Sequence, residues 1–172
     1  MLNSEQRTKL LQEIEVYKIK THIDGDPSET GLGFNYSLLA ELVEYISRTG
    51  SIVVEAIKHV AAIEGILKDL NHSYNVKRMT ETNKDNIRIL KSADLRNSAV
   101  DLMLLKDLEL IKNAEKDYID AKAFLDSTRQ HHSDLRQKHE VIKSQMEIMG
   151  HMRGIGEIRR PSQPQEKGPR II

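Results

Sequence analysis

The chain has 172 residues, and its 26 basic side chains balance its 26 acidic ones, so the formal net charge is zero. Charged residues make up 30% of the sequence and aromatic residues 4%, which excludes a thick multilayer core and suits helices packed through a narrow aliphatic seam. The absence of cysteine excludes disulfides, thiolate zinc sites and cysteine catalysis. No apolar run reaches the roughly 18 residues of a membrane span and no hydrophobic signal core is present, which predicts a soluble, cytoplasmic protein.

Two N-terminal segments precede the main body of the chain. Residues 1–22 carry apolar side chains at spacings of three and four, from Leu10 to Ile19, which predicts one amphipathic helix. Residues 23–36 then gather aspartate, proline and glycine. This is the clearest break inside the sequence, and it predicts a loop.

A helical core is predicted over residues 37–150. Its first helix has an apolar stripe broad enough to be covered on more than one side, so this helix is expected to be the most buried. Gly50 either interrupts the helix or kinks it, since one glycine costs a helix only about 1 kcal/mol relative to alanine. A charged connector between Thr80 and Ser92 is expected to lead to the second helix.

The second helix of the core, over about residues 92–149, carries the most informative pattern. Seam-compatible residues recur through seven heptads, and only Asp107 is plainly unsuited to a seam. Such a repeat specifies a left-handed coiled coil, and at 1.5 Å per residue the helix would be roughly 85 Å long. It needs a partner, either an earlier helix of the same chain or another subunit. The positions predicted to form an oligomer seam are Leu104, Ile111, Tyr118, Leu125, His132, Leu135, His139, Ile142, Met146 and Met149.

The C-terminal segment differs in composition from the helical core. Gly150, Gly154 and Gly156 are predicted to end the long helix. Residues 151–172 form a basic tail with three prolines and no periodicity, which predicts an extended segment without a core of its own. The pair Ile171–Ile172 is either a contact for a protein partner or a random apolar end.

Basic side chains concentrate in two stretches, each with a net charge of +3. Residues 77–96 hold six basic and three acidic side chains, and residues 151–172 hold five basic and two acidic ones. These stretches are candidate phosphate-binding surfaces, with an ordinary solvated face as the alternative. Because aromatic residues do not interleave with them, binding to a single strand would rest on phosphate contacts and depend strongly on salt. The candidate nucleic-acid-binding residues are Lys77, Arg78, Lys84, Arg88, Lys91, Arg96, Arg159 and Arg160.

No motif in the sequence points to catalysis. It contains no Walker sequence, no Gly-x-Ser-x-Gly and no complete dinucleotide-binding glycine pattern. An EF-hand starting at Asp24 fails, because Glu29 stands where the template needs glycine. His132 and His139 lie one heptad apart on the seam, which favours polar residues that fix register over metal ligands. We therefore predict no catalytic residue, no metal site and no cofactor.

The order of segments resembles that of a known family. A short helix, an acidic loop and an apolar helix precede Ser92-Ala-Asp-Leu, which opens a long helix ending in Ser133-Asp-Leu-Arg-Gln-Lys-His-Glu-Val-Ile-Lys143. Over residues 40–149 this pattern resembles the recombination mediator proteins of T4-type bacteriophages. The resemblance implies an all-helical, ring-forming homo-oligomer that binds single-stranded DNA and helps to load a recombinase in the host cytoplasm. The Pro-rich tail and the scarcity of aromatic residues depart from that family.

Taken together, the sequence predicts an all-α, elongated helical bundle with one long C-terminal coiled-coil helix and an extended Pro-rich tail. The predicted function is that of a non-enzymatic, oligomeric accessory protein of the mediator kind. One alternative is a structural or assembly protein, for example in a virion, that uses the coiled coil and the tail for subunit contacts. A second alternative is a helical adaptor or chaperone. A mediator requires the basic residues to converge on one surface, whereas an assembly protein uses its apolar faces and its tail.

Overall fold

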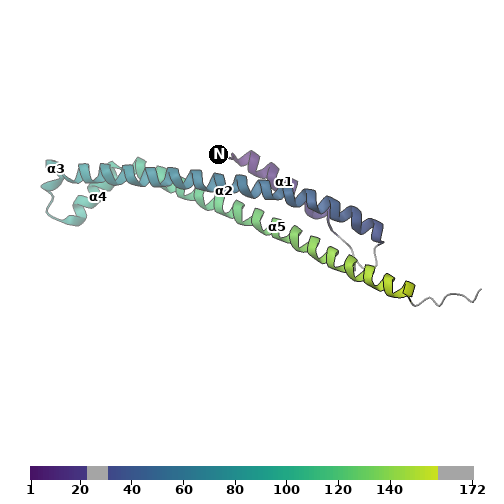
Figure 1. Cartoon of the computed structure of the whole chain (residues 1–172). Coiled ribbons are helices and arrows are strands. Elements are labelled where there is room, and N and C mark those ends of the chain that lie inside the picture. The colour runs from purple at the N-terminus through teal and green to yellow at the C-terminus, as the bar shows by residue number, and fades with distance from the viewer. Residues whose placement is uncertain (23–30, 159–172) are drawn as a thin grey trace, which may run out of the picture.

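The computed structural model describes residues 1–22 and 31–158, and these residues are almost entirely helical (Figure 1). The predicted all-α fold is confirmed for this part of the chain. The helices in chain order are α1 (Ser4–Lys20), α2 (Leu32–Thr82), α3 (Asp85–Arg88), α4 (Ala93–Met103) and α5 (Leu105–Ile158).

Helices α2 and α5 form a long antiparallel hairpin. Their 51 and 54 residues make rods of roughly 75 to 80 Å, since an α-helix rises 1.5 Å per residue. The start of α2 packs against the end of α5, where Leu38 and Leu42 share an apolar cluster with Ile142 and Met146. The two helices then stay side by side along the rod (Figure 1).

The predicted heptad seam lies between these two helices. Every predicted seam position is buried or half-buried, from Leu104 at 7% exposed to Met146 at 8%. Seam residues such as Leu125, Leu135 and Ile142 pack on α2 of the same chain, whose broad apolar stripe supplies the opposing row. The role of the ten residues as an oligomer seam, like oligomerisation itself, stays a prediction.

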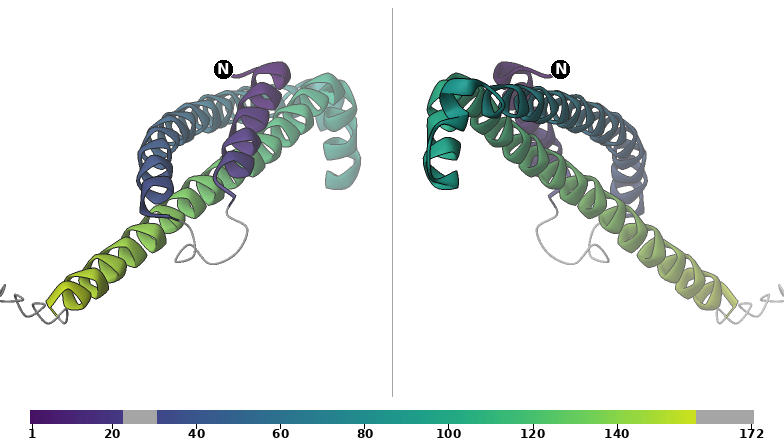
Figure 2. Two further views of the ribbon diagram at one scale, coloured as in Figure 1. Left: turned by 90° about the vertical axis from the view of Figure 1, so that its right-hand side faces the viewer. Right: turned by 90° about the vertical axis from the view of Figure 1, so that its left-hand side faces the viewer.

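Helix α1 covers one side of the α2–α5 seam (Figure 2). Ile14 is 2% exposed and enters an apolar cluster with Ile52 of α2 and Phe124 of α5. The ring of Tyr17 stacks on that of Tyr45 in α2, with 4.4 Å between the ring centroids. The rod is therefore a three-helix bundle over the length of α1 and a two-helix hairpin beyond it.

Two predicted helix boundaries are wrong at the N-terminal sides of the long helices. The loop expected up to residue 36 is shorter, because α2 begins at Leu32 with Gly31 as its N-cap. The helix expected over 92–149 is divided at Leu104, which joins α4 to α5 and buries its side chain against Ile87 of α3 and Val100 of α4. Helix α4 follows this local cluster rather than the axis of α5 (Figure 2).

Glycine does not end either long helix. Helix α2 continues through Gly50 without interruption, and α5 continues to Ile158 although Gly150, Gly154 and Gly156 were expected to stop it. A helical glycine costs only about 1 kcal/mol relative to alanine, which the neighbouring helical residues offset. Part of the predicted tail, residues 151–158, therefore belongs to α5, whereas residues 159–172 lie outside the described residues.

Candidate nucleic-acid interface

Six of the predicted nucleic-acid-binding residues lie at one end of the rod. Lys77 and Arg78 belong to the last turns of α2, Lys84 is the N-cap of α3 and Arg88 is its last residue. Lys91 follows in the connector and Arg96 belongs to α4; Figure 1 shows these elements together at the end of the hairpin. Arg159 and Arg160 lie outside the described residues, so their contribution stays a prediction.

Three of these six basic residues are paired with carboxylates of the same chain. Lys77 Nζ lies 2.6 Å from a carboxylate oxygen of Asp107. Arg78 lies 3.5 Å from Asp101, which also accepts a hydrogen bond of 2.9 Å from the Tyr74 hydroxyl. The third is a local i, i+3 contact of 2.7 Å between Lys84 and Glu81. The first contact joins the end of α2 to the start of α5 and the second joins it to α4, and all three leave their cations partly neutralised.

Arg88, Lys91 and Arg96 form no ion pair within the described ranges 1–22 and 31–158. We call these three residues the basic tip. Arg88 and Lys91 are exposed, and Arg96 is half-buried. Their backbone is held in place by the apolar cluster of Ile87, Val100 and Leu104 underneath. The basic tip is thus a set of cations carried by a packed helix end.

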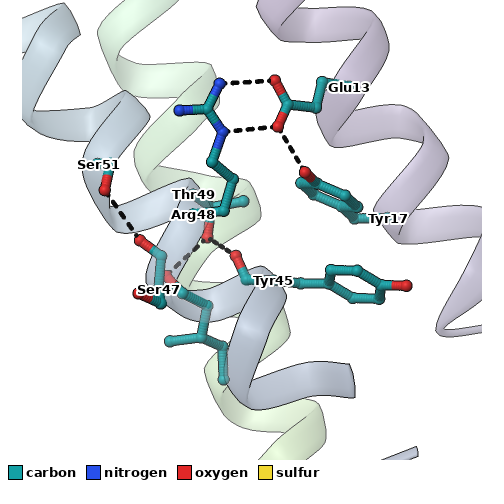
Figure 3. A network of polar contacts seen from close by, with 8 residues as sticks. Glu13, Tyr17, Tyr45, Ser47, Arg48, Thr49 and Ser51 are labelled. Atoms are coloured by element: carbon teal, nitrogen blue, oxygen red, sulfur yellow. Dashed lines mark hydrogen bonds and ion pairs between the residues drawn. The ribbon is translucent and has the colours of Figure 1, made fainter. Parts of the chain in front are cut away.

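A buried polar layer crosses the seam near its middle. The Thr49 hydroxyl, which donates to the carbonyl of Tyr45 at 2.8 Å, also lies 3.0 Å from Nδ1 of His132 (Figure 3 shows the Thr49 contacts within α2). The imidazole lies beside Gly50, where an added Cβ would be in ordinary van der Waals contact with His132 Cε1 at 3.4 Å. A polar pair between apolar clusters disfavours slipped registers, which agrees with the predicted role of His132. In the described part of the chain no three His, Asp or Glu side chains come together as metal ligands would.

An ion pair anchors α1 on α2 close to that layer (Figure 3). The guanidinium of Arg48 donates to both carboxylate oxygens of Glu13, at 2.7 and 3.0 Å. This contact holds the pKa of Glu13 below its ordinary value. The Tyr17 hydroxyl donates to the same carboxylate, and burial together with that acceptor raises the pKa of Tyr17 to about 12. The network fixes α1 in rotation as well as in position.

Between α1 and α5 lies a cavity of about 490 Å³. Its floor is apolar, with Ile14 from α1 and Ile142 from α5, and its rim carries the ammonium groups of Lys18 and Lys138. Lys138 Nζ lies 3.4 Å from the Thr21 carbonyl oxygen, so this lysine also ties the end of α1 to α5. The cavity was not predicted, because it depends on where α1 docks.

The start of the chain docks on a buried histidine of α2. The Leu2 amide donates to His59 Nδ1 at 3.3 Å, and His59 is 5% exposed. Its Nε2 is buried without a hydrogen-bond partner in the described residues. Burial lowers the pKa of His59 below its ordinary value of 6.5, and the nearby positive charge of Arg7 lowers it further, while Asp117 opposes the shift. The neutral imidazole is the form that fits this site.

Acidification is therefore expected to loosen the contact between His59 and the first residues. The folded-state pKa lies below the unfolded value, so the stabilisation is fully present above about pH 6.5 and is lost as the pH falls through the lower folded value. Thermal unfolding followed by circular dichroism from about pH 8 to about pH 5 should show a falling midpoint in this range. The His59→Gln variant should show a flatter dependence; an equal slope in both proteins would assign the effect to other groups.

No helix among the described residues is long and apolar enough to cross a membrane. No protein-family model, curated protein or solved structure matches this chain.

Proposed function

We propose that this chain is a non-enzymatic, homo-oligomeric accessory protein that binds single-stranded DNA through the basic tip and assists recombinase loading. The observation that supports the proposal is the position of Arg88, Lys91 and Arg96 at one end of the rod, without carboxylate partners in the described residues. Cations held by a packed helix end can meet phosphates without first breaking internal ion pairs. This is the arrangement that a phosphate-binding surface requires.

The expected mode of binding is electrostatic. Tyr74 packs against the apolar cluster under the basic tip. Its side chain is half-buried, and its hydroxyl donates a hydrogen bond to Asp101. It does not offer a free ring face on which a base could stack. Three phosphate contacts per protomer give a slope of about −2 in a plot of log K against log salt for a single strand. Repetition around a homo-oligomer would multiply these contacts and raise the affinity.

The test is fluorescence anisotropy of a labelled oligothymidylate at low and at physiological salt. The triple variant Arg88→Ala, Lys91→Ala, Arg96→Ala should bind at least about tenfold more weakly and with a smaller salt slope. The matched control removes three lysines remote from the tip, Lys9→Ala, Lys58→Ala and Lys116→Ala, and should bind nearly as the parent does. Equal loss in both triple variants would indicate unspecific charge effects, and no binding by the parent would reject the proposal.

A second candidate function, a structural or assembly protein, is favoured by exposed apolar side chains at the same end of the rod. Ile89 is 77% exposed, Leu102 is 72% exposed and Leu95 is 57% exposed. Side chains of this kind suit a contact with another protein better than a contact with phosphates. Light scattering of the double variant Leu95→Ser, Leu102→Ser separates the two candidate functions. An assembly role predicts that the molar mass of this variant falls below that of the parent, whereas DNA binding through the basic tip predicts no change in molar mass.

A further inference from the structure

The α2–α5 seam has two sides, and in the described part of the chain α1 covers one of them. Two sets of residues flank the seam of an antiparallel helix pair. On α5, residues directly before Leu125, His132 and His139 lie on one side of the seam, and residues directly after Leu135 and Ile142 lie on the other. On α5 the covered side carries Phe124, His131 and Lys138, which face the cluster or the cavity under α1. On α2 it carries Arg48, which binds Glu13 of α1. The opposite side is not covered by a described helix.

An apolar row runs along α2 on this open side. Val43 is 55% exposed and Ile57, two heptads further on, is 43% exposed. Between them lie the half-buried side chains of Ile46 and Val53, which are seven residues apart. Val43 and Ile46 line a hollow of about 200 Å³ together with Arg136 of α5, which shows that the two helices border the same groove. We call these four α2 residues the apolar row.

A row of cations runs along the α5 border of the groove. Lys122, Arg129, Arg136 and Lys143 follow one another at intervals of seven residues. Each comes directly after a buried heptad position: Ala121, Thr128, Leu135 and Ile142. We call these four the basic column. It spans 21 residues, or about 32 Å of helix. The ammonium group of Lys122 lies 4.8 Å from the centroid of the Tyr118 ring, and the other three cations have no ion pair in the described residues.

Carboxylates of α5 lie close to the basic column but do not neutralise it. Asp126, Glu140 and Glu147 each follow a cation by four residues, and Asp126 and Glu140 also precede the next cation by three residues. A cation that precedes a carboxylate at i, i+4 is the weaker orientation on a helix, and no such ion pair forms in the described structure. Glu64, at the end of the apolar row, is bound to Lys68 at 2.8 Å. The border of the groove therefore presents four cations that form no ion pair in the described residues next to apolar side chains, with three carboxylates on the outer side of the column.

We propose that the groove between the apolar row and the basic column is the docking site of an acidic amphipathic helix from a partner protein. Such a helix places apolar residues on Val43, Ile46, Val53 and Ile57 and carboxylates at one position of each heptad against the basic column. Three heptads match the length of the column. Helix α1 supplies the pattern on the other side of the seam, since it inserts Ile14 and binds Arg48 through Glu13. This inference is independent of the proposed function.

The chemistry of the groove favours a helix over a nucleic acid. Valine and isoleucine side chains provide a surface for leucine-type side chains and no ring on which a base could stack. The cations repeat at the interval of a heptad, about 10.5 Å, which is the repeat of side chains on one face of a partner helix. A single-stranded oligonucleotide and a second copy of this chain are the other occupants that the experiment tests.

The experiment uses the full chain and a labelled synthetic peptide of three heptads with leucine at the two seam positions and glutamate at the flanking positions. Fluorescence anisotropy at about 50 mM salt should detect binding that weakens as salt rises. The variant Arg129→Glu, Arg136→Glu should bind at least about tenfold more weakly. The control Lys112→Glu, Lys116→Glu changes the net charge by the same amount on the same helix and should bind as the parent does. Ile57→Ser should weaken binding without changing its salt dependence.

Five results would overturn the inference, four in binding and one in molar mass. The first two concern the peptide: it does not bind the parent, or a peptide of the same composition with scrambled leucines binds equally well. The third is equal affinity of the peptide for the Arg129→Glu, Arg136→Glu variant and for its charge-reversal control. The fourth is a loss of oligonucleotide binding in the Arg129→Glu, Arg136→Glu variant while peptide binding is unchanged. A molar mass that falls in the Arg129→Glu, Arg136→Glu variant in light scattering would instead assign the groove to contacts between copies. Failure of oligothymidylate to bind the parent removes the oligonucleotide readout but leaves the three peptide readouts and the molar mass unchanged, so the two proposals fail separately.

Discussion

Replacement of Leu125 by aspartate is expected to unfold the middle of the rod. Leu125 is 7% exposed and shares a cluster with Ile52, Ala56 and Phe124. The substitution removes buried apolar surface and places a carboxylate among aliphatic side chains, which together cost at least about 4 kcal/mol. Urea unfolding followed by circular dichroism at 222 nm should show either a much lower midpoint or no folded baseline.

The matched control is Ile119→Asp on the same helix. Ile119 is 65% exposed, so the same change in chemistry should cost less than about 0.5 kcal/mol. The comparison also tests which helix completes the seam. A Leu125→Asp protein that keeps the parent's unfolding midpoint but loses molar mass would show that the seam joins subunits rather than α2 and α5 of one chain.

Replacement of Ile14 by aspartate is expected to release α1 from the hairpin. Ile14 is the buried residue of this helix at 2% exposed, and the cavity between α1 and α5 begins at its side chain. A helix of 17 residues is marginal in water by itself, so release should also melt it. Amide exchange measured by mass spectrometry should show loss of protection over residues 4–20, with a loss of about 3 kcal/mol in stability.

The control for this prediction is Ile19→Asp, because Ile19 is 67% exposed on the same helix. It should leave amide protection of α1 close to that of the parent. Protection of α1 that survives Ile14→Asp would mean that the Arg48–Glu13 ion pair and the stacked Tyr17 and Tyr45 rings hold the helix without the apolar contact.

The heptad repeat made the seam predictable but not its partner. A seven-residue pattern from Leu104 to Met149 requires an opposing helix, and any apolar stripe of similar length satisfies it. The antiparallel pairing depends on the connector, which brings α2 and α5 together within one chain. Asp107 does not suit a seam by the heptad pattern, because the pattern takes no account of contacts with residues far away in sequence. Its carboxylate binds Lys77, which is 30 positions away in the sequence.

The break at Leu104 could not be predicted from periodicity, because Leu104 fits the heptad repeat. Its backbone leaves the helical region slightly, at φ −100° and ψ 18°, while its amide still donates to the Val100 carbonyl at 3.0 Å. The cluster with Ile87 decides the direction of α4, and that cluster exists only after α3 has folded back. Tertiary packing here overrides a local pattern that is otherwise continuous.

Charge counting does not separate the basic tip from cations that are paired in the structure. Composition gives Lys77 and Arg78 the same weight as Arg88 and Lys91, because their ion pairs with Asp107 and Asp101 join residues that are distant in sequence. It also missed the basic column, whose signal was present in the register of the seam. Each member of the column follows a buried heptad position, so a search of the positions beside the seam would have found it.

The apolar clusters follow one another along the rod, and this arrangement affects how the protein unfolds locally. The buried clusters around Leu42, Ile52 and Val100 are separate, and the Thr49–His132 pair lies between the first two. We expect a rod with separate clusters to open locally rather than all at once. Its ends can fray while its centre remains folded, so local unfolding gives a binding partner access to one segment at a time.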